Sequence, residues 1–207
     1  MVLKKRWAYL LKDWNQVLIA GAFSGEIDLL FTSGNFPHIQ TLGIGNLDAG
    51  LSTYKYLTEN PEIETVLFFG SAGAYTWSKI PIRSFVNASI FSQSEIAPLF
   101  SLAKQLPTEF IQFDPVNPLY PIEAICNSPS SITLHDLTDK TNDLWQVLQI
   151  ENLECYGIAR VCQKLNRQFQ AHFAITNLVS PDGSSEWQKN WRELSTELQL
   201  QFLNQIS

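Results

Sequence analysis

The sequence predicts an α/β protein, with helices layered on a central mixed β-sheet. Short apolar strands alternate with segments whose apolar residues recur at helical spacing, and four strand ends carry glycine or polar residues. Prolines interrupt the middle of the chain, which favours a partly antiparallel sheet over a purely parallel one. The 207 residues contain no internal repeat or linker, so we expect one domain spanning residues 1–207.

The first third of the chain predicts two strands, each followed by a helix. Residues 17–20 (V-L-I-A) are typical of a buried strand, and a glycine-containing turn then leads into a helix that starts at Glu26. Residues 39–42 predict a second strand. Asn46 is expected to cap the next helix, which stops at residues 60–61 (Asn-Pro).

The rest of the chain continues the alternation less regularly. Residues 66–69 predict a strand that runs into the turn Gly70–Gly73. Further strands are expected at 82–90, 124–126 and 171–176, and helices at 153–165 and 184–206. The last helix carries Trp187, Trp191, Leu194 and Leu198 on one stripe.

Composition excludes several classes of partner. The formal net charge is -6 and no run of Lys or Arg exists, which argues against binding a nucleic-acid backbone. No segment approaches the roughly 20 apolar residues of a membrane span, and no secretory signal is evident. Three sparse cysteines suit a reducing compartment and lack metal-ligand spacing. We therefore expect a cytoplasmic protein without a membrane partner, metal ion or cofactor.

The four strand ends are the candidate ligand site. They comprise residues 21–26, 43–46, 70–73 and Asn177. In open α/β sheets, ligands bind beyond the carboxyl ends of strands, where glycine lets the backbone approach closely. None of these segments matches a dinucleotide fingerprint or a phosphate-binding P-loop, so a nucleotide-phosphate cradle is not indicated. Each segment taken alone is also compatible with an ordinary strand-to-helix turn.

Glu154 is the most informative single residue. It lies four residues before Ile158, on an apolar stripe that Val161, Cys162 and Leu165 continue. A carboxylate facing a core is costly unless it is hydrogen-bonded, which points to a functional site. The alternative is an exposed first turn, where the helix dipole favours an acid.

Glu26 and Asn177 are the other candidates, and each has an ordinary alternative. Glu26 follows a strand, where the helix dipole alone could account for an acid, and Asn177 could simply form a turn. The three histidines have no nucleophile or carboxylate at telling spacing, so no catalytic triad is expected.

Taken in order, five segments carry a family resemblance. The chain resembles the purine nucleoside phosphorylase and methylthioadenosine nucleosidase superfamily over residues 17–180. The matching segments are A-G-A-F-S-G-E (20–26), L-G-I-G-N-L-D-A-G (42–50), G-S-A-G-A (70–74), N-L-E-C-Y-G-I-A (152–159) and I-T-N (175–177). Each motif is weak alone, and their order and spacing together are specific.

The resemblance implies a fold, an assembly and a reaction. The fold is a three-layer α/β/α arrangement of the phosphorylase/hydrolase-like kind, and the assembly is a homodimer or larger homo-oligomer. The reaction cleaves the bond between a purine and its ribose through an oxocarbenium-like state. Glu154 would then hold the ribose hydroxyls, Glu26 would help activate water, and Asn177 would contact the departing purine near N7.

The resemblance also assigns binding residues. Ser71, Ala72 and Gly73 would line the nucleophile and the base. Leu153 stands where the family usually has Met, and Phe173 stands where the nucleosidases have an Arg near the water. The small-molecule partner implied is a purine nucleoside.

Departures from the family pattern bear on the substrate. Asn177 replaces the Asp of adenine-specific nucleosidases, and an amide cannot supply a proton as a carboxylic acid does. Members acting on 6-oxopurines, including futalosine hydrolases, often have Asn there, and Trp187 resembles the futalosine hydrolase tail. The family's base-stacking aromatic falls near Ser131.

Three functions remain open. The first is hydrolysis of a purine nucleoside, with a 6-oxopurine base. The second is phosphorolysis, which needs cationic groups for phosphate, although no Arg lies between Arg83 and Arg160. The third is a catalytically inactive relative that binds a ligand, which Phe173 favours. We also expect Glu154 to be at least partly buried in a pocket shared with Glu26.

Overall fold

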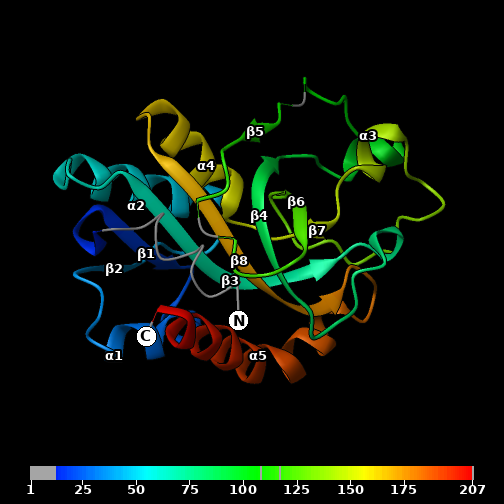
Figure 1. Ribbon diagram of the computed structural model, residues 1–207. Coiled ribbons are helices and arrows are strands. Elements are labelled where there is room, and N and C mark those ends of the chain that lie inside the picture. Colours follow the sequence, from blue (N-terminus) through cyan, green and yellow to red (C-terminus); the bar gives the residue numbers. More distant parts are fainter. Residues whose placement is uncertain (1–12, 108, 117, 207) are drawn as a thin grey trace.

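The computed structural model describes residues 13–107, 109–116 and 118–206, and it has a mixed β-sheet with helices on both faces (Figure 1). The strands are β1 (Val17–Gly21), β2 (His38–Thr41), β3 (Thr65–Ala74), β4 (Phe85–Ser92), β5 (Ile111–Gln112), β6 (Glu123–Asn127), β7 (Ile150–Glu151) and β8 (Gln168–Leu178). The α-helices are α1 (Asp28–Thr32), α2 (Asn46–Glu59), α3 (Asp143–Gln146), α4 (Cys155–Lys164) and α5 (Gly183–Ile206). The expected layered α/β fold with a mixed sheet is confirmed.

The two long strands β3 and β8 run parallel at the centre of the sheet. On one side β1 pairs in parallel with β3, and β2 pairs in parallel with β1. On the other side β8 pairs antiparallel with β4, β4 pairs with β6, β6 with β7, and β7 returns to β3. Five strands therefore close into a ring, while β1, β2 and β5 extend it (Figure 1).

The two faces of the sheet bury different sets of side chains. Phe68, Phe173 and Ile175 pack on one face, in the cluster that also contains the buried residues of α2 and α4. Phe69 and Ala174, from the same two strands, pack on the other face with α1 and α5. This alternation is the period of two that a strand imposes, and it decides which helix each side chain meets.

Three expected element boundaries were wrong in detail. Residues Gly70–Gly73 are not a turn but part of β3, because β7 and β8 both pair with them. The helix expected at Glu26 begins later, since Ser24–Glu26 form a separate 3-10 turn, η3, before α1. Asn46 is the first residue of α2 rather than its cap, and its side chain is used elsewhere.

The shorter elements were not predicted. The strands β5 and β7 have two residues each, and α3 has four. Within the part of the chain that the structure describes, no helix is long and apolar enough to cross a membrane.

Candidate active site

A cavity of about 370 Å³ opens where β1, β3 and β8 end, a size typical of small-molecule sites. This is the carboxyl edge of the parallel strands, where α/β folds hold ligands. The lining residues come mainly from the strand ends, the loop between β6 and α3, the start of α4 and the start of α5. They are Ala22, Phe23, Glu26, Ile44, Ser71, Ala72, Gly73, Ile132, Thr133, Glu151, Asn152, Leu153, Glu154, Asn177, Val179, Gly183, Ser184, Trp187 and Gln188.

Glu26 lies in this cavity with its carboxylate held on both oxygens. Its Oε1 accepts hydrogen bonds from the Ser71 backbone N–H at 3.0 Å and the Ser71 hydroxyl at 3.2 Å. Its Oε2 accepts one from the Ala22 N–H at 2.9 Å. The side chain is therefore fixed between the end of β1 and the end of β3, with only 3% of the residue exposed.

Burial makes the Glu26 carboxyl group a weaker acid than an exposed one. Loss of solvent, and then repulsion from Glu154, raise the pKa of Glu26 to about 8. The hydrogen bonds from Ala22 and Ser71 oppose this rise but do not cancel it. A carboxyl group of this acidity exchanges protons near neutral pH, as a general acid or base requires.

Trp187 adds a further contact from α5. Its indole N–H donates to the Ser71 hydroxyl at 3.0 Å, and that hydroxyl donates onward to Glu26. An indole N–H only donates, so it fixes the direction of the hydroxyl proton. The Ser71 proton is therefore directed to Glu26.

Glu154 immediately precedes α4 and faces the same cavity, with 5% of the residue exposed. Its Oε1 accepts from the Gly45 N–H at 3.0 Å, and its Oε2 accepts from the Asn152 side-chain amide at 2.7 Å. Burial raises the pKa of Glu154, while these donors oppose the rise. The expectation that Glu154 is buried in a pocket shared with Glu26 is confirmed.

Asn152 connects the two halves of the cavity. Its amide nitrogen donates to the Ser71 carbonyl at 3.2 Å as well as to Glu154. Its oxygen accepts from the backbone N–H groups of Glu154 and Cys155, which satisfies the start of α4. The Ser71 backbone N–H thus binds Glu26, and the Ser71 carbonyl is connected to Glu154 through Asn152.

The close approach of α2 and α4 brings Gly45 to Glu154. A Cβ atom at Gly157 would lie 2.1 Å from the Asn46 carbonyl oxygen, so only glycine fits there. The Asn46 side chain stabilises this contact between α2 and α4. Its oxygen accepts a hydrogen bond from the Gly157 N–H at 2.8 Å, and its NH₂ group donates one to the Ser128 carbonyl at 2.7 Å. This role explains why Asn46 does not cap its own helix.

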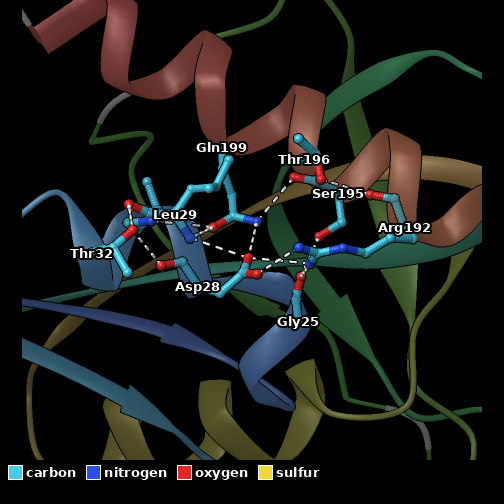
Figure 2. A network of polar contacts seen from close by, with 9 residues as sticks. Gly25, Asp28, Leu29, Thr32, Arg192, Ser195, Thr196 and Gln199 are labelled. Carbon is cyan, nitrogen blue, oxygen red and sulfur yellow. Dashed lines mark hydrogen bonds and ion pairs between the residues drawn. The ribbon is translucent and has the colours of Figure 1, made fainter.

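An ion pair and hydrogen bonds connect the segment that carries Glu26 to helix α5 (Figure 2). Arg192 makes an ion pair with Asp28 at 2.6 Å and donates to the Gly25 carbonyl at 2.8 Å. The buried Gln199 side chain accepts from the N–H groups of Leu29 and Leu30 at the start of α1. Helix α5 therefore holds both η3, which contains Glu26, and the start of α1 directly after it.

Asn177 reaches the cavity because β8 contains a bulge. Ile175 pairs with Ala72 and Asn177 pairs with Gly73, so Thr176 is an extra residue in β8. Ile175 packs on the α4 face, yet the Asn177 amide lies against Gly73, where a Cβ atom would be 2.8 Å from its nitrogen. One N–H of this amide donates to the Leu178 carbonyl, and its oxygen accepts from Thr176.

The cavity is acidic. Glu26, Glu151 and Glu154 line it, and none of the described residues in its lining is Lys, Arg or His. Among the described residues no group of three or more His, Cys, Asp or Glu side chains could hold a metal ion.

Comparisons with known proteins identify the fold. No family model and no curated protein sequence matches the chain. A mutant of the Helicobacter pylori 5′-methylthioadenosine nucleosidase, with 5′-methylthioadenosine in its active site, matches with a TM-score of 0.74 at 15% identity, over 92% of this chain and 97% of that chain. The native futalosine hydrolase of Helicobacter pylori matches with a TM-score of 0.74 at 14% identity, over 92% and 96%.

A third solved structure agrees with these two. The 5′-methylthioadenosine/S-adenosylhomocysteine nucleosidase of Neisseria meningitidis, in complex with methylthio-immucillin-A, matches with a TM-score of 0.74 at 14% identity, over 92% of this chain and 97% of that chain. The chain has the nucleosidase fold. The fold that the five sequence motifs imply is therefore confirmed.

Most site residues expected from the sequence line this cavity of the nucleosidase fold. They are Glu26, Ser71, Ala72, Gly73, Leu153, Glu154 and Asn177. Phe173 is the exception, and the expectation that it touches the ligand needs correction. It is fully buried, packs against Phe68 in the core, and is absent from the cavity lining. It lies four residues before Asn177, about 13 Å along the strand, and the bulge turns the two side chains to opposite faces.

Several lining residues were not foreseen as site residues. Ile132 and Thr133 come from the loop between β6 and α3, next to Ser131, where the family resemblance places the base-stacking aromatic. Glu151 belongs to the two-residue strand β7, and Asn152 follows it. Asn152 opens the Asn-Leu-Glu motif and Glu151 directly precedes it, and this was the sequence signal for these two residues.

Proposed function

We propose that the protein hydrolyses the N-glycosidic bond of a purine nucleoside. The observation that carries this proposal is the pair of buried carboxyl groups, Glu26 and Glu154, in one cavity of the nucleosidase fold. The neighbours named as nucleosidases and futalosine hydrolase support the same reaction class.

Glu26 acts on the water. In the reaction the bond between ribose C1′ and the base nitrogen breaks, and its electron pair leaves with the base. The water oxygen bonds to C1′ and gives a proton to the ionised Glu26 carboxylate. The Ser71 and Ala22 donors hold that carboxylate in one orientation, so its remaining lone pairs are available to the water.

Glu154 binds the sugar. An ionised carboxylate accepts hydrogen bonds from two adjacent hydroxyls, as the 2′- and 3′-hydroxyls of ribose present them. Gly45 and Asn152 fix its orientation, and its negative charge stabilises the positive charge that develops on the ribose in the transition state.

Asn177 contacts the base, and we infer a preference for 6-oxopurines. One amide N–H is bonded to Leu178, which leaves the second N–H for a purine acceptor such as N7 or a 6-oxo group. Replacing Asn177 with Asp should shift the preference toward adenosine. A polar group left unpaired by the wrong base costs about 1–3 kcal/mol, roughly tenfold to a hundredfold in kcat/KM.

Water is the favoured nucleophile over phosphate. Phosphorolysis requires the site to hold an anion, and cationic side chains or clustered N–H donors usually do so. The described lining contains three glutamates and no cationic side chain. A phosphate entering it would meet repulsion from Glu26 and Glu154.

The experiment is a panel of inosine, guanosine, adenosine, 5′-methylthioadenosine and futalosine, each with and without inorganic phosphate. Free base is measured by chromatography. Base release without phosphate is the expected result, and strict dependence on phosphate would assign a phosphorylase. Binding without turnover of any nucleoside would instead favour the inactive relative, the alternative drawn from Phe173 in place of the family's Arg.

The self-association implied by the family resemblance stays a proposal. Helix α2 leaves Leu47, Leu51 and Tyr54 exposed at helical spacing, a surface compatible with contact between copies. Light scattering coupled to size-exclusion chromatography would test it, and a monomer at micromolar concentration would contradict it.

A further inference from the structure

A third glutamate lines the cavity and has no role in the reaction described above. Glu151 is 7% exposed and lies in β7, on the far side of Gly73 from Asn177. Buried carboxylates are costly, so a carboxyl group kept at a cavity wall indicates a partner there.

Glu151 is held as an acceptor at both oxygens. Its Oε1 accepts from the Thr133 N–H at 2.9 Å, and its Oε2 accepts from the Tyr75 hydroxyl at 2.9 Å. The Tyr75 oxygen in turn accepts from the Asn127 amide at 2.9 Å, so its own proton is committed to Glu151. Burial raises the pKa of Glu151, and these two donors oppose that rise.

The strand register places Glu151 and Asn177 on one face. Gly73 pairs with Glu151 on β7 and with Asn177 on β8, so the two residues flank it on adjacent strands, about 10 Å apart. Residues directly opposite in an antiparallel pair point to the same face, and Tyr75, two positions on, reaches Glu151 from that face. The Asn177 amide also lies on the face of the missing Gly73 side chain.

Gly73 has no side chain, and the Asn177 amide lies over it, with its nitrogen 2.8 Å from where a Cβ atom would be. Glu151, on the other side of Gly73, lines the same cavity, and the two polar side chains have complementary chemistry. Asn177 has a second amide N–H that can donate a hydrogen bond, whereas the Glu151 carboxylate can only accept one. A ligand edge in the cavity that contacts both side chains would carry a hydrogen-bond acceptor at one end and a donor N–H at the other. The 6-oxopurines have this pattern, with acceptors at N7 and O6 and a donor at N1, whereas adenine has a lone pair at N1.

We propose that Glu151 is a specificity-determining residue, which accepts a hydrogen bond from a ring N–H of the base while Asn177 donates to the same base across Gly73. The inference rests on the proposed function only in requiring a purine ligand. It assigns to Glu151, Tyr75 and Thr133 a recognition site that is separate from the two carboxyl groups placed on water and ribose.

The test compares inosine with adenosine in wild type and in Glu151→Gln. The glutamine amide keeps the shape of the side chain, and its oxygen can still accept a hydrogen bond from Tyr75 or Thr133. Its NH₂ group cannot accept a hydrogen bond from the ring N–H of the base. We expect kcat/KM for inosine to fall by about tenfold to a hundredfold and that for adenosine by less than about threefold. Equal losses on both substrates, or no loss on inosine, would overturn the inference.

Tyr75→Phe supplies a second variant that leaves the carboxyl group in place. It removes the hydroxyl that orients Glu151, so we expect the same selective loss on inosine with a smaller size. If Glu151→Gln fails to fold, as judged by its thermal melt, this variant decides alone. A loss that is equal for the two nucleosides would show a structural role only.

Calorimetric titration with free hypoxanthine and free adenine separates this inference from the proposed function. If wild type cleaves no nucleoside yet binds hypoxanthine about tenfold or more tightly than Glu151→Gln does, the reaction is refuted and the recognition site stands. If wild type cleaves inosine and the two proteins bind hypoxanthine equally, the reaction stands and the role of Glu151 is refuted. Absence of binding of either base to wild type would also refute it.

Discussion

Ser71 donates two hydrogen bonds to one carboxylate oxygen of Glu26, from its backbone N–H and from its hydroxyl, across 45 positions of sequence. The strands β1 and β3 are neighbours in the sheet, so residues at their carboxyl ends meet although they are distant in the chain. The Trp187 indole fixes the Ser71 hydroxyl from α5. The proposed catalytic base is therefore held by three separate parts of the fold.

The first prediction concerns the pH dependence of the reaction. Glu26 accepts a proton only when ionised, and its pKa is raised to about 8 by burial and by Glu154. We expect kcat/KM to rise by about tenfold per pH unit below 8 and to level off above it. Initial rates between pH 6 and 9 would check this. A profile that is flat or falls between pH 6 and 8 would remove Glu26 from the role of base.

The second prediction concerns stability. Because the pKa of Glu26 is higher in the folded protein than its ordinary 4.5, folding favours the protonated form. Its contribution to stability is present below about pH 4.5 and is lost as the pH rises through about 8. Glu26→Gln carries no such charge, so its free energy of unfolding should gain on that of wild type between pH 5 and pH 9, by a few kcal/mol as an order of magnitude. A constant cost from the Gln NH₂ group facing the N–H donors of Glu26 cancels in this comparison of two pH values.

Urea denaturation of both proteins at pH 5 and pH 9 measures this difference. Glu59→Gln is the matched control, because Glu59 is an exposed acid on α2. We expect the control to follow wild type at both pH values. A stability difference between Glu26→Gln and wild type that is the same at pH 5 and pH 9 would show that burial does not destabilise the carboxylate.

The third prediction separates the sugar from the base. Glu154→Gln keeps the hydrogen-bonding length of the side chain but loses the charge that faces the ribose, so kcat/KM on ribonucleosides should fall by about a hundredfold or more. The fall in kcat/KM caused by Glu154→Gln should be smaller on a 2′-deoxyribonucleoside, which lacks one of the hydroxyls. Comparing inosine with 2′-deoxyinosine gives the answer, and equal losses on the two would place Glu154 away from the 2′-hydroxyl.

The fourth prediction tests the contact between α2 and α4. In Gly157→Ala the new methyl group would collide with the Asn46 carbonyl, at 2.1 Å in the present geometry. Separating the helices should cost about 1–3 kcal/mol of stability and withdraw the Gly45 N–H from Glu154. Lys55→Ala on the exposed face of α2 is the control. A thermal melt of Gly157→Ala that matches wild type would contradict the close contact.

The long elements could be predicted from the sequence because their signals are local. The apolar runs of β1 and β3 and the helical spacing in α4 and α5 are each visible within a dozen residues. The closure of five strands into a ring was not visible, because it depends on β7. This strand has two residues and pairs with β3, some 77 positions earlier in the chain.

The site was predictable where a motif and its strand agree, as for Glu26 and Glu154. Phe173 failed because its predicted place assumes a regular strand, whereas the extra residue Thr176 turns Asn177 to the other face. Glu151 was missed because its role depends on register with Gly73, which a single sequence does not reveal. The motifs indicated which chain segments meet at the cavity better than they indicated which side chains face it.

The central claim is that Glu26 activates water to cleave a nucleoside. The most direct measurement incubates wild type and Glu26→Gln with inosine, or with the best substrate of the panel, in phosphate-free buffer made with ¹⁸O-labelled water. Mass spectrometry of the released sugar reads the outcome. The account predicts one heavy oxygen in the sugar with wild type, and a rate reduced by about a thousandfold or more with Glu26→Gln. Base release only after phosphate is added, or a Glu26→Gln rate equal to wild type, would contradict it.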